Sequence, residues 1–249
     1  MTDFLRKLRN GERLVATWIK TPHPHVVEVL AHSALDALVL DAEHAPFGRE
    51  ALDSCVLAAR TWGKPVLVRP AANDPSAILQ ALDAGAHGVV IPHVRNRKEA
   101  EAAVLACHYR PGGRGFAGST RAAGYTTAGM AAHRKSAQDV AVIVQIEDAE
   151  AVAAIDEIAR VEGIDGLFIG RADLTVSLEA DTPDDTVVVE AVETICAACV
   201  AAGMPAGMFL SRPADANYWR ERGATFFFLR SDQEFLLSGA RDLAAAIES

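Results

Sequence analysis

The sequence of 249 residues contains few aromatic residues, few cysteines and few lysines. Aromatic residues account for 6% of the chain and hydrophobic residues for 50%, so we expect a core built mainly from Ala, Val, Leu and Ile, as in parallel sheets covered by helices. No apolar run approaches the ~20 residues needed to span a bilayer, and the N-terminus lacks the apolar segment of a signal peptide. We therefore expect no membrane association.

The four cysteines do not form the dense pattern of a disulfide framework. Cys196 and Cys199 make a Cys-x-x-Cys pair, but the residues around them follow a helical apolar pattern and no second pair of ligands follows. Packing inside a helix is therefore favoured over redox or metal chemistry. This use of cysteine indicates a reducing compartment, and we expect the cytoplasm.

Positive charge is scarce as well. The chain carries 24 Lys and Arg against 33 Asp and Glu, a net charge of −9. The one short basic run, residues 95–98, has the mixed polar context of a solvated helix start. Because nucleic-acid surfaces need a basic patch, we expect no nucleic-acid partner.

Short apolar runs alternate with helical patterns along the whole chain. Eight such runs predict strands buried on both faces, at residues 13–18, 36–41, 65–69, 88–92, 140–146, 165–169, 205–210 and 224–229. Helices are predicted near residues 24–33, 48–62, 74–84, 96–107, 149–161, 184–202, 212–222 and 232–247. The repeat predicts an α/β protein with one domain over residues 1–249, a (β/α)₈ TIM barrel.

An open doubly wound sheet is the alternative fold. The count of eight units disfavours it, and so does the absence of a Gly-x-Gly-x-x-Gly fingerprint at the first strand-to-helix turn. The connection 109–139 is unusually long for a compact barrel. We interpret it as a functional loop, either a wall of the active site or a subunit contact.

Polar side chains follow the carboxyl ends of most predicted strands, where barrel enzymes carry their catalytic groups. In chain order they are Trp18, Lys20, Asp41, Glu43, His44, Arg69, His93, Gln145, Glu147, Asp173, Arg230 and Asp232. Glu147 and Asp173 follow neighbouring strands, and two carboxylates at one mouth suit Mg²⁺ or Mn²⁺. The alternative for either acid alone is a helix cap or a surface position.

A second pair is Asp41 and His44. We expect Asp41 to hold one imidazole nitrogen of His44, which would leave the other nitrogen as a base. Arg69 could bind a substrate carboxylate or stabilise a developing oxyanion, and its alternative is a structural ion pair. His93 lies at the same rim without an obvious partner.

Two absences narrow the chemistry further. The loops after the seventh and eighth strands lack the glycines of a barrel phosphate site, which disfavours a phosphorylated substrate. Of the five lysines, Lys20 alone follows a predicted strand end, and it lies beyond that end. Schiff-base chemistry is therefore poorly supported, and metal-assisted chemistry is favoured.

Several motifs in order resemble the metal-dependent pyruvate aldolases, a family that includes 4-hydroxy-2-oxoheptanedioate aldolase and 2-dehydro-3-deoxyglucarate aldolase and lies near the citrate lyase β-subunits. They are Asp41-Ala-Glu-His-Ala-Pro, Arg69-Pro, Gly112-Gly-Arg-Gly, Gln145-Ile-Glu147 and Gly163-Ile-Asp-Gly-Leu-Phe-Ile-Gly-x-Ala-Asp173-Leu. The resemblance covers residues 4–245 and implies a barrel, a hexamer, and Mg²⁺, Mn²⁺ or Co²⁺ as cofactor.

The resemblance also implies roles for individual residues. Glu147 and Asp173 would ligate the metal, His44 oriented by Asp41 would be the acid/base group, and Arg69 would bind the keto oxygen of pyruvate and steady its enolate. Substrate contacts would come from Trp18, Arg69, Gln145, Gly170 and Ala172. The expected reaction is reversible cleavage of a 4-hydroxy-2-oxo acid to pyruvate and an aldehyde.

The sequence departs from the family pattern at two positions. Arg171 stands where Pro is expected, and Glu179 where Gly is expected. The acidic stretch 178–185 around Glu179 predicts a rim that disfavours a dianionic aldehyde. Two alternative functions remain open, a CoA-thioester lyase like the citrate lyases and a non-catalytic barrel that binds 2-oxo acids.

Overall fold

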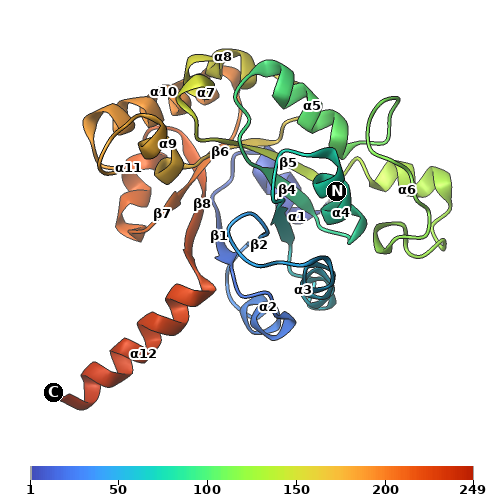
Figure 1. Ribbon diagram of the computed structural model, residues 1–249, viewed down its shortest axis with the longest axis horizontal. Coiled ribbons are helices and arrows are strands. Elements are labelled where there is room, and N and C mark those ends of the chain that lie inside the picture. The colour runs from blue at the N-terminus through green and yellow to red at the C-terminus, as the bar shows by residue number, and fades with distance from the viewer. Residues whose placement is uncertain (1, 249) are drawn as a thin grey trace.

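The computed structural model describes residues 2–248, and they form a closed barrel of eight parallel strands surrounded by helices (Figure 1). The strands pair in chain order, and β1 closes the barrel against β8. Their bounds are β1 Leu14–Ile19, β2 Ala37–Asp41, β3 Val66–Arg69, β4 Gly88–Ile91, β5 Ala141–Ile146, β6 Gly166–Ile169, β7 Ala206–Leu210 and β8 Ala224–Ser231. The TIM barrel predicted from the repeat is confirmed.

The barrel interior is filled by alternate residues of the strands, as expected for a packed barrel rather than a pore. Trp18, Phe168 and Phe228 lie at its centre, with the rings of Phe168 and Phe228 stacked at 4.4 Å. Gly207 on β7 makes room for this packing, because a Cβ there would lie 2.2 Å from the ring of Phe226. A second apolar cluster fills the layer between the outer faces of the strands and the helices.

The first helix, α1 (Asp3–Arg9), closes the amino-terminal end of the barrel. Its residues Phe4, Leu5 and Leu8 belong to the interior cluster, and Leu8 packs beside Gly166 at the start of β6. The helical pattern of this segment was not predicted. With the amino-terminal end closed, the barrel is open to ligands at the carboxyl ends of its strands.

The other helices cover the outside of the barrel, and their order follows the predicted units. They are α2 Pro24–Ala31, α3 Arg49–Thr61, α4 Pro75–Asp83, α5 Arg97–Cys107, α7 Ala149–Ala153, α8 Ile155–Ile158, α9 Arg171–Ser177, α10 Thr186–Ala202 and α11 Ala216–Arg220. The predicted helix 149–161 is broken at Ala154, and the predicted helix 212–222 consists of a 3₁₀ turn (η2, Pro213–Asp215) followed by α11. Helix α9 was not predicted.

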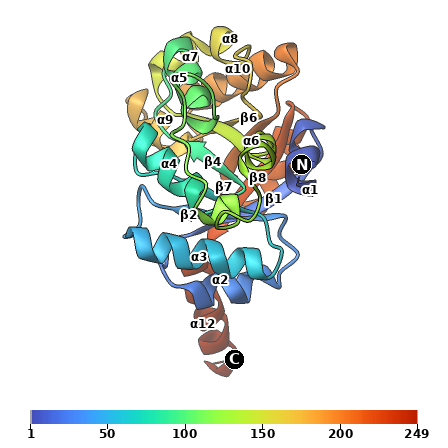
Figure 2. The ribbon, with the colours of Figure 1, turned by 90° about the vertical axis from the view of Figure 1, so that its right-hand side faces the viewer.

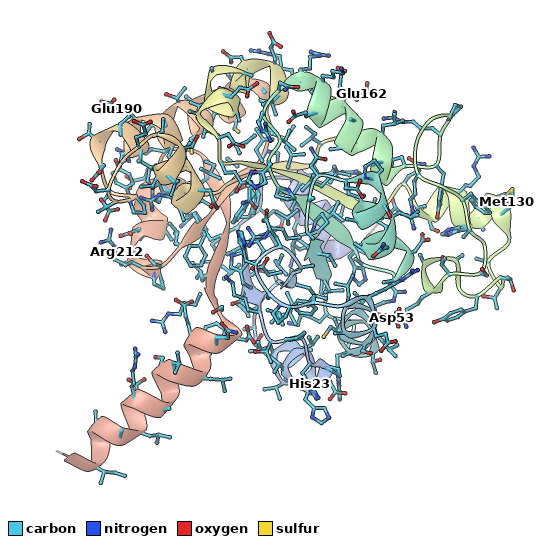
Figure 3. The ribbon with its side chains drawn as sticks, viewed as in Figure 1. His23, Asp53, Met130, Glu162, Glu190 and Arg212 are labelled. Atoms are coloured by element: carbon cyan, nitrogen blue, oxygen red, sulfur yellow. The ribbon has the colours of Figure 1, made fainter. Side chains whose placement is uncertain are left out.

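The long connection after α5 contains a 3₁₀ turn (η1, Arg121–Ala123) and the helix α6 (Met130–Ser136), which sequence analysis treated as loop. Long-range ion pairs hold it against the barrel: Arg114 pairs with Asp83 on α4, and Arg121 pairs with Asp53 on α3 at 2.6 Å. Figure 3 shows Met130 at the outer edge of this connection, far from the strand ends.

The last helix, α12 (Asp232–Glu248), leads away from the barrel instead of packing on it, as two perpendicular views show (Figures 1 and 2). It carries large apolar side chains into solvent, with Leu243 73% exposed and Ile247 88% exposed. Across residues 2–248, no helix combines the length and apolarity required to cross a membrane.

Candidate active site

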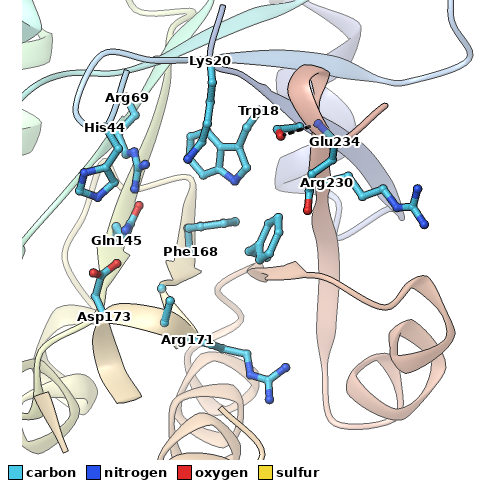
Figure 4. Close-up of a pocket in the computed structure, with 14 residues that line it drawn as sticks. Trp18, Lys20, His44, Arg69, Gln145, Phe168, Arg171, Asp173, Arg230 and Glu234 are labelled. Carbon is cyan, nitrogen blue, oxygen red and sulfur yellow. Dashed lines mark hydrogen bonds between the residues drawn. The ribbon is translucent and has the colours of Figure 1, made fainter. Parts of the chain in front are cut away.

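A cavity of about 250 Å³ opens at the carboxyl ends of the strands (Figure 4). Residues from β1, β3, β5, β6, β7 and β8 line it together with the segments that follow β2 and β6. The lining residues are Trp18, Lys20, His44, Arg69, Gln145, Phe168, Gly170, Arg171, Ala172, Asp173, Phe209, Arg230, Ser231 and Glu234. The structure thus brings to one cavity six residues predicted for catalysis or substrate binding, together with the predicted metal ligand Asp173; the six are Trp18, His44, Arg69, Gln145, Gly170 and Ala172.

Asp41 and Arg69 form a buried ion pair below this cavity. They are register partners on β2 and β3, which places their side chains side by side. Arg69 donates to Asp41 Oδ1 from Nε at 3.0 Å and from Nη2 at 2.8 Å, and its guanidinium lies 4.4 Å from the centre of the Trp18 ring. Burial raises the pKa of the Asp41 carboxyl, but the charge and hydrogen bonds of Arg69, the His44 N–H and the charge of Lys20 together hold that pKa below its usual value.

The expected contact between Asp41 and the imidazole of His44 is not what the structure contains. Asp41 Oδ1 accepts a hydrogen bond from the backbone N–H of His44 at 3.1 Å. Asp41 therefore fixes the turn that carries His44, and the ring itself lies beside another acid, with Nε2 3.7 Å from Glu43 Oε2. The sequence could not show this, because a separation of three positions allows either a side-chain or a backbone contact.

Glu43 is a site residue that sequence reasoning named at a strand end but gave no role. Its Oε2 lies 3.1 Å from Arg69 Nη1, and its Oε1 lies 3.3 Å from His93 Nε2. Asp41 Oδ1 accepts from two of the five N–H groups of Arg69, at Nε and Nη2, and Glu43 pairs with Nη1 by charge. Arg69 also lines the cavity, where its remaining N–H groups can meet a ligand.

Gln145 and Glu147 project from the end of β5 toward the segment that begins α9. Gln145 donates from Nε2 to Glu147 Oε2, and Gln145 Oε1 is buried with no hydrogen-bond partner among the described residues. Glu147 is 2% exposed. Burial raises the pKa of Glu147, and the charge of Asp173 adds to the rise, against hydrogen bonds from His93 and Gln145 that lower it.

Gly170 allows α9 to start directly above this pair. A Cβ at position 170 would lie 2.9 Å from Glu147 Cβ and 3.0 Å from both Glu147 Oε2 and Gln145 Nε2. Asp173 follows in the first turn of α9 and faces the Gln145 side of the cavity (Figure 4). Glu147 and Asp173 therefore lie at the same end of the cavity, and their role as ligands of a shared cation stays a prediction.

The described residues contain no group of three or more His, Cys, Asp or Glu side chains arranged to hold a metal ion. Glu147 and Asp173 are two carboxylates, and hard divalent cations often take one or two from the protein and complete their coordination with substrate and water. The unpaired oxygen of Gln145 next to Glu147 is a further acceptor of the kind such a cation or its water requires. The residues present fit a divalent metal.

His93 has partners that were not expected from the sequence. Its backbone N–H donates to Glu147 Oε1 at 2.7 Å, and its ring lies between Glu147 and Glu43. Burial lowers the pKa of His93, but the negative charges of Glu147, Glu43 and Asp148 together outweigh it and the pKa is raised. No signal in the sequence could have found these contacts, because they depend on the left-handed backbone at His93, with φ +54°.

The opposite wall of the cavity is formed where β8 meets α12. Asp232, 2% exposed, accepts hydrogen bonds from the backbone N–H of Lys20 at 2.7 Å and of Thr21 at 3.0 Å. Lys20 lines the cavity, but its Nζ lies 3.4 Å from Asp41 Oδ2, so its charge is paired with the buried carboxylate. This placement agrees with the weak case for a Schiff base.

The two departures from the family pattern have structural explanations. The guanidinium of Arg171 turns away from Gln145 (Figure 4) and donates to the carbonyl of Pro183 at 2.6 Å. Asp184 pairs with Arg171 at 3.2 Å and with Arg212 at 3.1 Å, so part of the acidic stretch 178–185 is neutralised. Glu179 adopts φ +54°, the left-handed conformation for which glycine would be the easier residue.

The cysteines take no part in the site. All four are free and buried, and Cys196 and Cys199 lie within α10. Burial raises the pKa of each of these two thiols to about 12, so they stay protonated and inert. Their interpretation as helix packing is consistent with this environment.

Comparison with known proteins places the whole chain among aldolases. A pyruvate aldolase of Rhizobium etli is 34% identical over 247 residues, covering 98% of this chain and 97% of that protein. A 4-hydroxy-2-oxo-heptane-1,7-dioate aldolase of Salmonella dublin is 35% identical over 244 residues, covering 97% of this chain and 93% of that protein.

Solved structures and the family model agree with these relatives. A crystal structure of an HpcH/HpaI aldolase/citrate lyase family protein from Burkholderia cenocepacia superimposes with a TM-score of 0.94 at 31% identity, and each chain is covered completely. The family model described as HpcH/HpaI aldolase/citrate lyase matches residues 14–238. The resemblance seen in the strand-end motifs is thereby confirmed, and the chain belongs to the HpcH/HpaI aldolase/citrate lyase family of carbon–carbon lyases.

Proposed function

We propose that the protein is a metal-dependent aldolase that reversibly cleaves a 4-hydroxy-2-oxo acid to pyruvate and an aldehyde. One observation carries the proposal: Arg69, Gln145 and Asp173 line the same cavity as His44, with the buried Glu147 directly behind Gln145. The site thus combines a guanidinium that can bind a carboxylate or an oxyanion, two carboxylates that can hold a metal, and an imidazole that can accept a proton. A barrel that only binds 2-oxo acids would not need the proton acceptor.

Glu147 and Asp173 would hold the divalent cation, and we propose Mg²⁺, Mn²⁺ or Co²⁺. When bound, such a cation polarises a keto oxygen and stabilises negative charge on it. The unpaired Oε1 of Gln145 would accept from water or face the cation. Burial and the charge of Asp173 raise the pKa of Glu147 despite the opposing effect of His93, and a cation beside Glu147 would stabilise its ionised form.

Arg69 and the start of α9 would bind the 2-oxo acid. The N–H groups of Arg69 that are not bonded to Asp41 can donate to the keto oxygen as charge develops there. The first N–H groups of a helix have no acceptor within the helix, so the backbone N–H groups of Ala172 and Asp173 can take the substrate carboxylate. Gly170, whose own N–H donates to the carbonyl of Ile146, would contribute by letting the substrate approach closely. Trp18 and Phe168 form an aromatic floor that excludes water below the reacting carbons.

His44 would move the proton in the bond-breaking step. Its side chain is half exposed and lines the cavity, where a neutral imidazole can accept the proton of the 4-hydroxyl group as the C3–C4 bond breaks. In the synthetic direction the same ring returns that proton to the new alkoxide. Asp41 contributes by fixing the His44 turn and by holding Arg69 in place.

We also propose that the chain forms a homo-oligomer, the hexamer implied by the family resemblance, in a reducing compartment such as the cytoplasm. The projecting helix α12 supports the first proposal, since its exposed leucines need a partner surface. The four free cysteines support the second. Light scattering of the purified protein measures the subunit number directly.

Removal and return of metal test the enzymatic proposal. The protein is stripped with EDTA, desalted, and incubated with a 4-hydroxy-2-oxo acid while pyruvate release is followed. We expect pyruvate release to disappear and to recover when Mg²⁺ or Mn²⁺ is added. Full activity in the stripped protein would refute the metal-dependent scheme, and no turnover with any metal while pyruvate still binds in calorimetry would favour the non-catalytic barrel.

A further inference from the structure

His93 is placed by an unusual backbone conformation. It follows β4 and Pro92, and its φ of +54° lies in the left-handed region that few residues other than glycine adopt. Strained backbone of this kind costs on the order of 1 kcal/mol and persists where the surroundings over-determine it, often beside functional groups. At His93 the conformation directs two donors toward one carboxylate.

Both donors reach the same oxygen of Glu147. The backbone N–H of His93 donates to Glu147 Oε1 at 2.7 Å, and ring atom Nδ1 lies 3.2 Å from that oxygen and 3.5 Å from Asp148 Oδ2. The other oxygen, Oε2, accepts a hydrogen bond from Gln145 and lies near Gly170 at the start of α9, the helix whose first turn carries Asp173. Glu147 is therefore held from behind by Oε1, while Oε2 faces the site.

The far edge of the ring contacts the arginine side of the site. Nε2 of His93 lies 3.3 Å from Glu43 Oε1, and Glu43 Oε2 lies 3.1 Å from Arg69 Nη1. One imidazole thus spans the gap between the segment after β2 and the end of β5. His93 is not among the residues that line the cavity, so it acts on the substrate only through others.

We propose that His93 is a positioning residue whose ring fixes the Glu147 carboxylate for the metal and couples its orientation to Glu43 and Arg69. The proposal rests on the metal-dependent function proposed above, because it assigns Glu147 as a ligand. Groups that hydrogen-bond the ligands of a metal orient them, and their loss weakens metal affinity by about 10- to 100-fold. In this site, His93 would orient Glu147 in this way.

The test replaces His93 by glycine, which keeps the backbone N–H and accepts the left-handed conformation but removes the ring. Tyr125→Gly is the matched control, because Tyr125 also has a left-handed backbone, with φ +52°, and is 60% exposed on the connection after α5. Mn²⁺ is titrated into each metal-stripped protein, and free Mn²⁺ is measured by electron paramagnetic resonance without any substrate. Thermal unfolding of the stripped proteins reports the cost to the fold.

We expect Mn²⁺ to bind His93→Gly about 10-fold or more weakly than wild type, while Tyr125→Gly binds it normally. His93→Asn, which tolerates the left-handed backbone and retains a side-chain donor, should lie between them. Wild-type affinity in His93→Gly would overturn the proposal, and so would tighter binding, which would mean that the ring competes with the metal. Glu147→Gln is the check on the underlying function: if it too binds Mn²⁺ like wild type, the metal site itself is wrong and not merely the part assigned to His93.

Discussion

Gly170→Ala perturbs the proposed metal site without changing any charge. The backbone at Gly170 has φ −83° and ψ 77°, which an alanine can adopt, so the substitution acts only through its methyl group. That methyl would lie 2.9 Å from Glu147 Cβ and 3.0 Å from Glu147 Oε2 and Gln145 Nε2. Ordinary contacts begin at 3.4 Å, so the two side chains must yield by roughly half an ångström.

The size of the effect follows from how sharply catalysis depends on geometry. A misplacement of about 1 Å can cost about 10²-fold in rate, so a shift of half that size should lower kcat/KM by about 10-fold, or about 1.4 kcal/mol of transition-state stabilisation. Pyruvate release at saturating Mn²⁺ measures this loss. Because overpacking also destabilises by about 1–3 kcal/mol, the assay is run well below the unfolding temperature.

Gly48→Ala is the control, since a Cβ at Gly48 meets nothing within 4 Å and its backbone, with φ −75°, accepts alanine. This variant should retain wild-type kcat/KM. Unchanged activity in Gly170→Ala would mean that Glu147 and Gln145 do not define the reactive geometry. An equal loss in both variants would mean that the effect is not specific to the site.

Three further predictions test other parts of the structure. Arg69→Ala should lower turnover by at least ~10²-fold, as for the loss of one oxyanion donor, measured as steady-state pyruvate release; a smaller loss would assign Arg69 a structural part. His87 accepts from the N–H of Val66 through Nδ1 at 3.1 Å, and burial with help from Arg60 lowers its pKa from 6.5 to about 4. Because the unfolded chain then binds a proton that the folded chain does not, stability present above pH 6.5 is lost on acidification, by about 3 kcal/mol at pH 4. Denaturant unfolding at both pH values should show this loss in wild type beyond that in His87→Asn. Gly207→Ala should destabilise the fold by about 1–3 kcal/mol or more through its clash with Phe226, visible as a lower thermal midpoint.

The barrel could be predicted because each of its units carries a local signal. Apolar runs recur eight times, and glycine precedes several of the strands, as Gly63 precedes β3 and Gly163 precedes β6. Helix α1 was missed although Thr2 caps it, whereas the long connection after α5 lacks such signals. Helix α6 and its flanks are held by Arg114–Asp83 and Arg121–Asp53, contacts between distant residues that no local pattern shows.

The candidate site also has features that the sequence predicts and features that it does not. Arg69, Gln145 and Asp173 converge because parallel strands end at one rim, which the order of the strands alone dictates. Which atoms touch depends on register and on backbone angles. The partner of the His44 ring and the contacts of His93 follow from such details, and they are the points at which the sequence-based interpretation differed from the structure.

Asp232 connects the wall of the cavity to α12, the helix through which we propose that the chain forms an oligomer. This residue starts α12 and fixes the backbone at Lys20 and Thr21, while Glu234 in the same helix lines the cavity. If a neighbouring subunit holds the outer turns of α12, dissociation of the oligomer leaves this helix free to move. Its movement would displace the part of the cavity wall that α12 forms. Specific activity would then fall on dilution, and rates from different preparations can be compared only at matched protein concentration.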